Sequence, residues 1–565
     1  MHRSSDSSSS SREQAVDYSE KPIVLQTVIS DPDLQTEAYG PSGFAGLFAS
    51  SHVALCVAFS AIGGLLFGYD QGIISVIITM DNFLDKFPEV SELAPGSGFY
   101  KGLMTAIITL GAVFGAFNVG WISDAYSRKY TIMFSVAVFT IGSVLQTAAV
   151  DYAMLVVARL ISGVGIGLLS AVVPLYISEV SPAEIRGTLL VFQELSIVFG
   201  IIMAYWVTFG TRYIPNQWSW RLPFLLQVFP SLVLGAGTIF LPFSPRWLAN
   251  QGMDNQCLKT LSRLRQLPAT DSRVEKEWLD ILAEARFQQQ LLIERHSSIM
   301  HPTFIHKVRL EIATWADCFK KSCWRRTVVA SGLAFFQQFV GINALIYYSP
   351  ALFAKMGLDY NMELVMSGVL NVMQLVGIIT SIWSMDRIGR RTLLLGGSIA
   401  MLTCHLVVAG LVGRFSGDWS AHRAESWVSV AFLLAFTFIY GCSWGPVGWA
   451  MPAEIFPSSL RAKGVATTVC FNWISNFVVG LITPSLVQTT NYGTYIFFAA
   501  FCGLAYIFTF YCVPETKGRS LEEMDQVFGD RTASGDMERK CRVLEEVRGV
   551  KKSAVDGGVC GIMEA

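Results

Sequence analysis

Long apolar runs recur along this sequence, and they limit what it can fold into. A helix that crosses the hydrocarbon core of a bilayer needs about 20 mainly apolar residues. Runs of that size lie near residues 52–78, 101–122, 130–149, 153–175, 188–209 and 221–241, and again near 327–348, 363–384, 392–412, 427–451, 465–486 and 494–513. The sequence therefore predicts an all-α membrane protein whose twelve transmembrane helices fall into two groups of six.

The charged residues lie between these runs and are scarce. Only 15% of the residues are charged and 52% are hydrophobic, whereas soluble domains carry about 25% charged residues. A formal net charge of −1 offers no electrostatic basis for binding nucleic acid. We therefore expect a lipid bilayer around the protein and no nucleic-acid partner.

The positions of the charges also divide the chain. Residues 1–50 are Ser-rich and are expected to form a disordered cytosolic tail. Residues 51–241 and 327–513 are expected to form the two bundles, joined by a cytosolic helical linker at 242–326 with a helix over 274–294. Residues 514–565 would form a C-terminal tail.

Basic residues in short loops predict the orientation, because such loops stay in the cytosol. Arg128 and Lys129 follow the second run, and Arg387, Arg390 and Arg391 follow the eighth. With an even number of spans, both termini would be cytosolic. The expected location is the cell membrane.

Two charged residues stand alone inside apolar runs. Asp70 lies in the first run and Arg159 early in the fourth. A charge at membrane depth costs several kcal/mol, roughly 2.5 to 3.5 on insertion scales. Asp70 therefore indicates a buried site for a proton, a cation or a polar solute, and Arg159 needs a partner.

The sequence contains no motif that indicates an enzyme. It contains no Cys-x-x-Cys pair, no Gly-rich phosphate loop and no arrangement of nucleophile and base. We therefore expect no enzyme activity, no cofactor and no metal site.

The two halves of the chain repeat each other in their charged loops. Asp-Ala-Tyr-Ser-Arg-Lys at 124–129 matches Asp-Arg-Ile-Gly-Arg-Arg at 386–391. Likewise, the Glu-…-Arg-Gly segment at 178–187 matches the segment at 453–464. A duplicated six-helix unit is typical of transporters whose two bundles rock about a central site.

Seven motifs identify the family that this chain resembles. They are Phe-Gly-Tyr-Asp-Gln-Gly (67–72), Arg-Leu-Ile-Ser-Gly-Val-Gly-Ile-Gly (159–167), Pro-Leu-Tyr-Ile-Ser-Glu-Val-Ser-Pro (174–182), Ser-Pro-Arg-Trp-Leu (244–248), Gln-Gln-Phe-Val-Gly-Ile-Asn-Ala-Leu-Ile-Tyr-Tyr (337–348), Trp-Gly-Pro-Val-Gly-Trp (444–449) and Pro-Glu-Thr-Lys-Gly-Arg-Ser-Leu-Glu-Glu (514–523). In this order they resemble the sugar porter family of the major facilitator superfamily, and fungal members most closely. The resemblance implies the major facilitator fold, with two pseudo-symmetric six-helix bundles.

The resemblance implies a cytosolic gate made of ion pairs between helices. The matching residues are Asp124, Arg128, Glu179 and Arg186 in the first half and Asp386, Arg390, Glu454 and Arg461 in the second. Ala125, Ser127 and Phe243 depart from the family pattern, so the resemblance supports the second-half network more fully than the first. The alternative interpretation is that these charges only set the orientation of the chain in the membrane.

The resemblance also implies a sugar site. The matching residues are Phe67, Gln337, Gln338, Asn343, Trp449 and Asn472, with Tyr347 at the outer gate. Neutral amides hydrogen-bond sugar hydroxyls, and an aromatic face covers the C–H surface. In the family, the seventh span is broken near Gly341. A single buried Gln can instead serve an interhelical hydrogen bond.

Two site positions depart from the family pattern. Gln374 stands where the family has asparagine, and Glu194, preceded by Gln193, stands where it has glutamine. Glu194 has three open interpretations: it accepts sugar hydroxyls, it titrates as a second proton site, or Gln193 faces the site in its place. A carboxylate there argues against acidic substrates.

In family symporters the residues that match Asp70 and Arg159 form the proton-coupling pair. The resemblance thus implies a monomeric transporter that moves a hexose or pentose with protons. A static buried pair is the structural alternative. The functional alternatives are a uniport facilitator with the same pocket and a transporter-like sugar sensor, which the short C-terminal tail disfavours.

Overall fold

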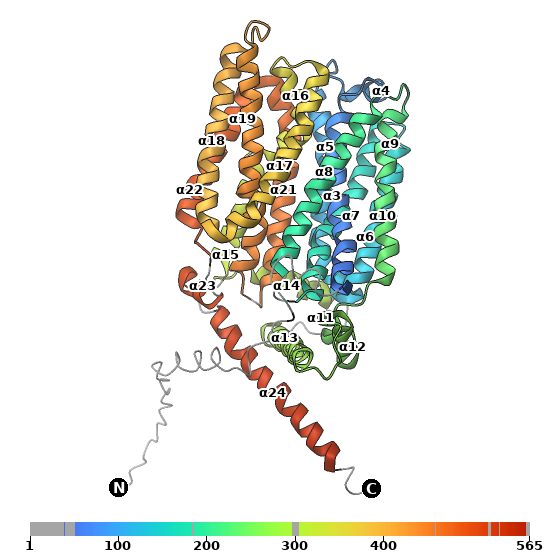
Figure 1. Cartoon of the computed structure of the whole chain (residues 1–565), viewed down its shortest axis with the longest axis vertical. Helices are drawn as coiled ribbons and strands as arrows, with labels where there is room; N and C mark the ends of the chain where they lie inside the picture. Colours follow the sequence, from blue (N-terminus) through green and yellow to red (C-terminus); the bar gives the residue numbers. More distant parts are fainter. Residues whose placement is uncertain are drawn as a thin grey trace, which may run out of the picture.

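The structure is a computed structural model that describes Tyr39 and residues 51–182, 186–296, 304–321, 323–457, 459–517, 521–529 and 532–560. Every regular element in these ranges is a helix. The helices of the N-terminal half stand beside those of the C-terminal half, and further helices lie under one end of both (Figure 1). We call that end the linker face and the opposite end the far face.

The helices that form the spans of the N-terminal half are α3 (Ser51–Ile77), α5 (Ser97–Tyr126), α6 (Arg128–Thr147), α7 (Tyr152–Val180), α8 (Arg186–Thr211), α9 (Trp218–Leu226) and α10 (Val228–Phe240). Those of the C-terminal half are α15 (Trp324–Phe339), α16 (Ile342–Lys355), α17 (Tyr360–Ile388), α18 (Arg390–Phe415), α19 (Arg423–Cys442), α20 (Trp444–Ile455), α21 (Arg461–Thr490) and α22 (Gly493–Cys512). On the far face, α4 (Asp81–Lys86) and the short helix η1 (Pro88–Val90) join α3 to α5.

Among the described residues, 12 helical stretches are long and apolar enough to cross a membrane. Each overlaps one of the runs predicted from the sequence, so the all-helical fold with twelve spans is confirmed.

Three of the spans consist of two helices each. Pro230 lacks the N–H that would bond the Leu226 carbonyl between α9 and α10. Pro446 likewise leaves the Cys442 carbonyl without its donor between α19 and α20. The third break, between α15 and α16, lies at Gly341, whose φ is 103°. Only this third break was predicted.

The two halves pack against each other along α5 and α21. A Cβ added to Gly102 of α5 would lie 2.3 Å from the carbonyl oxygen of Leu481 in α21. Small residues let helix backbones approach closely in membranes, where the hydrophobic effect does not drive helices together. Gly102 therefore sets the spacing of the halves near the far face.

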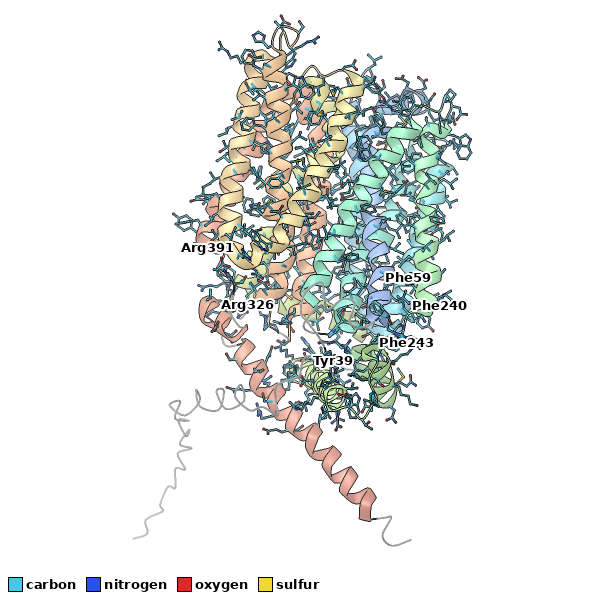
Figure 2. All side chains as sticks on the ribbon, in the orientation of Figure 1. Tyr39, Phe59, Phe240, Phe243, Arg326 and Arg391 are labelled. Carbon is cyan, nitrogen blue, oxygen red and sulfur yellow. The ribbon has the colours of Figure 1, made fainter. Side chains whose placement is uncertain are left out.

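The linker contains α11 (Pro245–Asn250), α12 (Asp254–Arg265), α13 (Ser272–His296) and α14 (Phe304–Asp317). The helix predicted over 274–294 is thus confirmed. The C-terminal segment forms α23 (Leu521–Phe528) and α24 (Thr532–Cys560), and Val543 and Val547 of α24 share an apolar core with α13. At the base of the C-terminal half, Arg326 pairs with Asp525 of α23 at 2.7 Å (Figure 2).

Some predictions fall outside what the structure describes. Apart from Tyr39, the predicted N-terminal tail (1–50) lies outside the described residues. So do the side chains of Arg186 and Asp386, two of the predicted gate residues.

Candidate functional site

The structure brings the two isolated charges together in the N-terminal half. Asp70 of α3 and Arg159 of α7 are each 1% exposed or less. Their nearest charged atoms, Oδ2 and Nη2, lie 3.7 Å apart, which is too far for a hydrogen bond. Arg159 Nη2 also lies 3.4 Å from the Thr105 carbonyl oxygen of α5.

Several polar atoms of this pair have no hydrogen-bond partner within the described part of the chain. They are both carboxylate oxygens of Asp70 and the Nε and Nη1 atoms of Arg159. A buried charge is stable only when it is paired and hydrogen-bonded. The attraction between these groups is therefore electrostatic and loose, and adding a proton to Asp70 would disrupt no hydrogen bond of the pair.

Four amide side chains form one hydrogen-bonded set in the C-terminal half. Asn472 of α21 donates to Gln337 Oε1 at 2.6 Å, and Gln338 Nε2 donates to Asn472 Oδ1 at 3.1 Å. Asn343 donates to Gln338. Gln337 in turn donates to the carbonyl oxygen of Gly445 at 2.8 Å, beside the break between α19 and α20.

The break at Gly341 explains how these amides converge. Gln337 and Gln338 lie in the last turn of α15, and Asn343 lies in the first turn of α16. A continuous helix would not place residues 338 and 343 on one face. The positive φ of Gly341 turns α16 so that Asn343 reaches Gln338.

Two tryptophans accompany the amide set. Trp449 of α20 is half-buried, and it lines a small pocket with Ala334, Gly448 and Asn472. Trp473 of α21 is buried and lies edge-on to Phe67 of α3, with 4.9 Å between the ring centroids. Its indole Nε1–H has no hydrogen-bond partner among the described residues.

Trp473 was not predicted from the sequence. The only signal available was its position next to Asn472, because nothing in the sequence indicates that it faces Phe67 of the other half. It supplies an aromatic surface and a free donor beside the amides.

Tyr347 of α16 links the two halves. Gln71 of α3 donates to its hydroxyl at 3.2 Å, and the hydroxyl lies 3.4 Å from Asn476 Oδ1 of α21. Gln71 was not predicted as a site residue, although it follows Asp70 directly. The residue next to Asp70 in the chain therefore bonds the predicted outer gate directly.

The residues that depart from the family pattern point in different directions. Gln193 is buried, and its backbone and side chain pack on Gly64 of α3. Glu194 is half-buried and interacts electrostatically with Tyr440 of α19, in the other half. Gln374 of α17 is buried, and its Oε1 has no partner in the described structure. Glu194, rather than Gln193, thus lies toward the C-terminal half.

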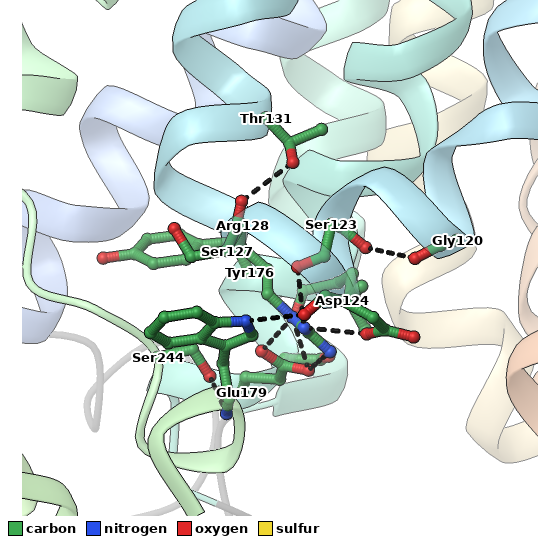
Figure 3. A network of polar contacts seen from close by, with 12 residues as sticks. Gly120, Ser123, Asp124, Ser127, Arg128, Thr131, Tyr176, Glu179 and Ser244 are labelled. Carbon is green, nitrogen blue, oxygen red and sulfur yellow. Dashed lines mark hydrogen bonds and ion pairs between the residues drawn. The ribbon is translucent and has the colours of Figure 1, made fainter. Parts of the chain in front are cut away.

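On the linker face, five of the predicted gate charges form ion pairs within one half or the other. In the N-terminal half, Arg128 Nε lies 2.9 Å from Glu179 Oε2, and Arg128 Nη1 lies 2.9 Å from Asp124 Oδ1 (Figure 3). In the C-terminal half, Arg390 Nη2 lies 3.1 Å from Glu454 Oε1. Arg461 Nε lies 3.4 Å from the Phe456 carbonyl oxygen.

The N-terminal network forms despite its sequence departures. Phe243 lies where the N-terminal half meets the linker (Figure 2) and stacks on Trp247, with 5.5 Å between the ring centroids. Trp247 Nε1 donates to the Asp124 carbonyl oxygen at 3.0 Å. Aromatic packing therefore supports this loop at a position that departs from the family pattern.

Comparisons with known proteins identify the family of this chain. A family model described as sugar (and other) transporter matches residues 56–528. Sugar transport protein 7 of Arabidopsis thaliana is 33% identical over 505 residues, which cover 86% of this chain and 94% of the plant protein. The high glucose sensor RGT2 of Saccharomyces cerevisiae is 36% identical over 487 residues, which cover 83% of this chain and 60% of the sensor.

Solved structures of the E. coli xylose transporter XylE share the fold. The partially occluded inward-open conformation gives a TM-score of 0.68 at 24% identity, covering 84% of this chain and 100% of that chain. The predicted resemblance to sugar porters is confirmed, but the special likeness to fungal members is supported only in part, because plant and yeast relatives match at similar identity. The chain belongs to the sugar transporter family of the major facilitator superfamily.

Proposed function

We propose that this protein carries a monosaccharide, a hexose or a pentose, into the cell by proton symport through alternating access. The observation that carries the proposal is that Gln71, which directly follows Asp70 in α3, bonds Tyr347 of the other half. A buried ionisable pair thus lies on one side of this bond, and a residue that touches the amide-bearing helices lies on the other. Protonation of Asp70 would therefore alter the contact between Gln71 and Tyr347 at the gate.

The amide set supplies the substrate site. Gln337, Gln338, Asn343 and Asn472 hydrogen-bond one another. A sugar hydroxyl both donates and accepts, so it can bond to these amides in place of a neighbouring amide. Phe67, Trp449 and Trp473 supply apolar faces for the sugar ring. In this proposal, Gln374 and Glu194 are further contacts that shape the site.

The cycle begins when Asp70 takes up a proton from the far face. The neutral acid loses its attraction for Arg159, so α3 and Gln71 are free to shift against Tyr347. Sugar binds to the amides, the halves close over it on the far face, and they separate on the linker face. There the ion pairs of Arg128 and Arg390 open and close with the cycle.

This proposal places the linker and both termini in the cytosol and the protein in the cell membrane as a monomer. It rests on the basic loops after the second and eighth spans. Glu194 remains a candidate for a second proton site beside the amides.

Sugar-induced alkalinisation of the medium tests the proposal. Cells that express the wild-type protein should take up hexose or pentose with protons and accumulate it. A potential of 100 mV supplies about 2.3 kcal/mol per charge, or roughly 40-fold accumulation. Asp70→Asn should abolish the proton signal and reduce accumulation to equilibration, while the exposed Asp81→Asn should behave like wild type.

Two outcomes would point to the alternatives. Equal uptake by wild type and Asp70→Asn, with no proton signal in either, would leave a uniport facilitator. Absence of uptake together with a sugar-dependent transcriptional response would favour a sensor, an alternative that the 36% identity to RGT2 supports.

A further inference from the structure

The break between α15 and α16 is the point on which the amide set depends. Gly341 N–H bonds the Gln338 carbonyl at 3.0 Å, and Leu345 N–H bonds the Gly341 carbonyl at 3.2 Å. The turn before Gly341 is thus closed by a bond across three residues, and a new α-helix begins after Gly341. Carbonyl groups at the end of a helix need donors from outside the helix.

A histidine from another span supplies such a donor. His405 lies in the middle of α18 and is fully buried, and its Nε2 lies 3.0 Å from the carbonyl oxygen of Val340. Because a carbonyl only accepts, Nε2 carries the hydrogen. Nδ1 has no partner in the described structure, which agrees with a neutral ring that uses Nε2 as its donor.

Aromatic rings hold His405 in this position. The imidazole lies against Phe436 of α19, with 4.5 Å between the centroids, and against Phe498 of α22, at 5.8 Å. Phe498 also covers the break itself, since a Cβ on Gly341 would lie 2.8 Å from its ring. Three helices, α18, α19 and α22, therefore meet at the turn between α15 and α16.

Packing alone does not account for a histidine at this position. A buried polar ring in a membrane span is costly unless it makes a hydrogen bond, and leucine would fill similar space without that cost. The hydrogen bond to Val340 is what distinguishes His405 from an apolar side chain.

We propose that His405 is a positioning residue that fixes the angle between the two halves of the seventh span. It thereby keeps Gln337 and Gln338 of α15 turned toward the same site as Asn343 of α16. This role rests on the proposed transport function. Without the hydrogen bond, α16 moves independently of α15, so the site is less preorganised and sugar affinity falls more than turnover.

Three substitutions separate the hydrogen bond from packing. In His405→Gln the amide nitrogen takes the place of Nε2, so it still reaches Val340. In His405→Asn the amide nitrogen lies at the level of Nδ1 and falls short. His405→Leu has no donor at all.

Sugar uptake, normalised to the amount of protein at the surface, gives the first measurement. We expect KM within about twofold of wild type for His405→Gln. For His405→Asn and His405→Leu we expect KM to rise about five- to twentyfold, with Vmax changed less than about threefold, because one buried carbonyl is left without its donor.

Hydrogen–deuterium exchange of residues 336–346 in the purified protein gives a measurement that needs no substrate. Exchange should be faster in His405→Asn and His405→Leu but not in His405→Gln. Wild-type KM and wild-type exchange in His405→Asn would overturn the proposal. The proposal would also be overturned if all three variants lost transport only in proportion to the amount of protein present, with KM unchanged.

The two proposals can fail separately. If the wild-type protein transports no monosaccharide, the proposed function fails, and the exchange measurement still decides whether His405 holds the break. If the wild-type protein takes up sugar and hydrogen–deuterium exchange is the same in His405→Gln and His405→Asn, only the proposed role of His405 fails.

Discussion

Ser127 adopts a backbone conformation that normally requires glycine. Its φ and ψ are 88° and 156°. Gly389, at the matching turn of the second half, has φ and ψ of 102° and 153°. This region is essentially open only to glycine, and a side chain there costs on the order of 1–3 kcal/mol. The internal duplication thus preserves the turn, although one copy has lost the glycine.

Replacing Ser127 with glycine should therefore stabilise the protein by about 1 kcal/mol. The loss of the weak bond from Tyr130 N–H to Ser127 Oγ, at 3.4 Å, costs only a few tenths of a kcal/mol. The thermal unfolding midpoint in detergent measures the change, and Ser127→Gly should raise it. The reciprocal Gly389→Ser should lower it. A lower midpoint for Ser127→Gly would contradict the strain argument.

On the far face, α8 and α17 join the two halves. Tyr205 of α8 donates to the Leu364 carbonyl oxygen of α17 at 2.6 Å. Arg212 donates to Asn361 Oδ1 at 2.6 Å, and its guanidinium lies 5.3 Å from the ring centroid of Tyr360. In the proposed cycle, these contacts must break when the site opens to the far face.

Arg212→Ala should therefore favour the state that is open on the far face. A cation–π contact and a hydrogen bond together contribute about 1–2 kcal/mol, so the open population should rise roughly five- to thirtyfold. The reactivity of a cysteine placed at the buried Ser75 of α3, in a cysteine-depleted background, toward an impermeant thiol reagent measures this population. Arg221→Ala is the matched control, because Arg221 bonds the Ala149 carbonyl within its own half. Equal labelling in both variants would show that Arg212 does not hold the halves together.

The linker connects both halves of the whole molecule. Trp315 of α14 stacks on Phe117 of α5, with 4.9 Å between the centroids, and Glu311 of α14 pairs with Lys463 of α21. At the end of α14, Asp317 accepts from His296 of α13 at 2.9 Å and pairs with Lys320 at 2.7 Å. Asp317 therefore ties α13 to the helix that touches both halves.

Acid should weaken the contact that Asp317 makes between α13 and α14. Burial opposes ionisation of Asp317, but hydrogen bonds from Lys320 and His296 outweigh it and hold the pKa of the carboxyl below its usual value. A lowered folded-state pKa stabilises the fold above the usual carboxyl pKa of about 3.9, and the stabilisation is lost as the pH falls through the lower value. Protease cleavage of the linker should therefore accelerate below about pH 4. Asp317→Asn should remove this step and make cleavage faster at neutral pH, and identical pH profiles for the two proteins would refute the assignment.

The sequence by itself determined the spans of this molecule. Twelve helical stretches follow from hydropathy, because a backbone in lipid must satisfy its own hydrogen bonds and the helix does so within one segment. The motif around Gly341 likewise predicted the break in the seventh span. The other two breaks were not predicted, since proline does not always interrupt a span. Pro174 and Pro484 lie inside continuous helices, whereas Pro230 and Pro446 lie at the start of new ones.

Only the tertiary structure decided which side chains meet. The contact of Trp473 with Phe67, the link from Gln71 to Tyr347 and the bond from His405 to Val340 each join different helices. The direction of Glu194 toward Tyr440 was equally open in the sequence. The helical period gives the spacing of residues within one span, but the rotation of each helix about its axis comes from packing against its neighbours. The sequence therefore determined where the chain crosses the membrane, and helix packing decided which buried polar groups face one another.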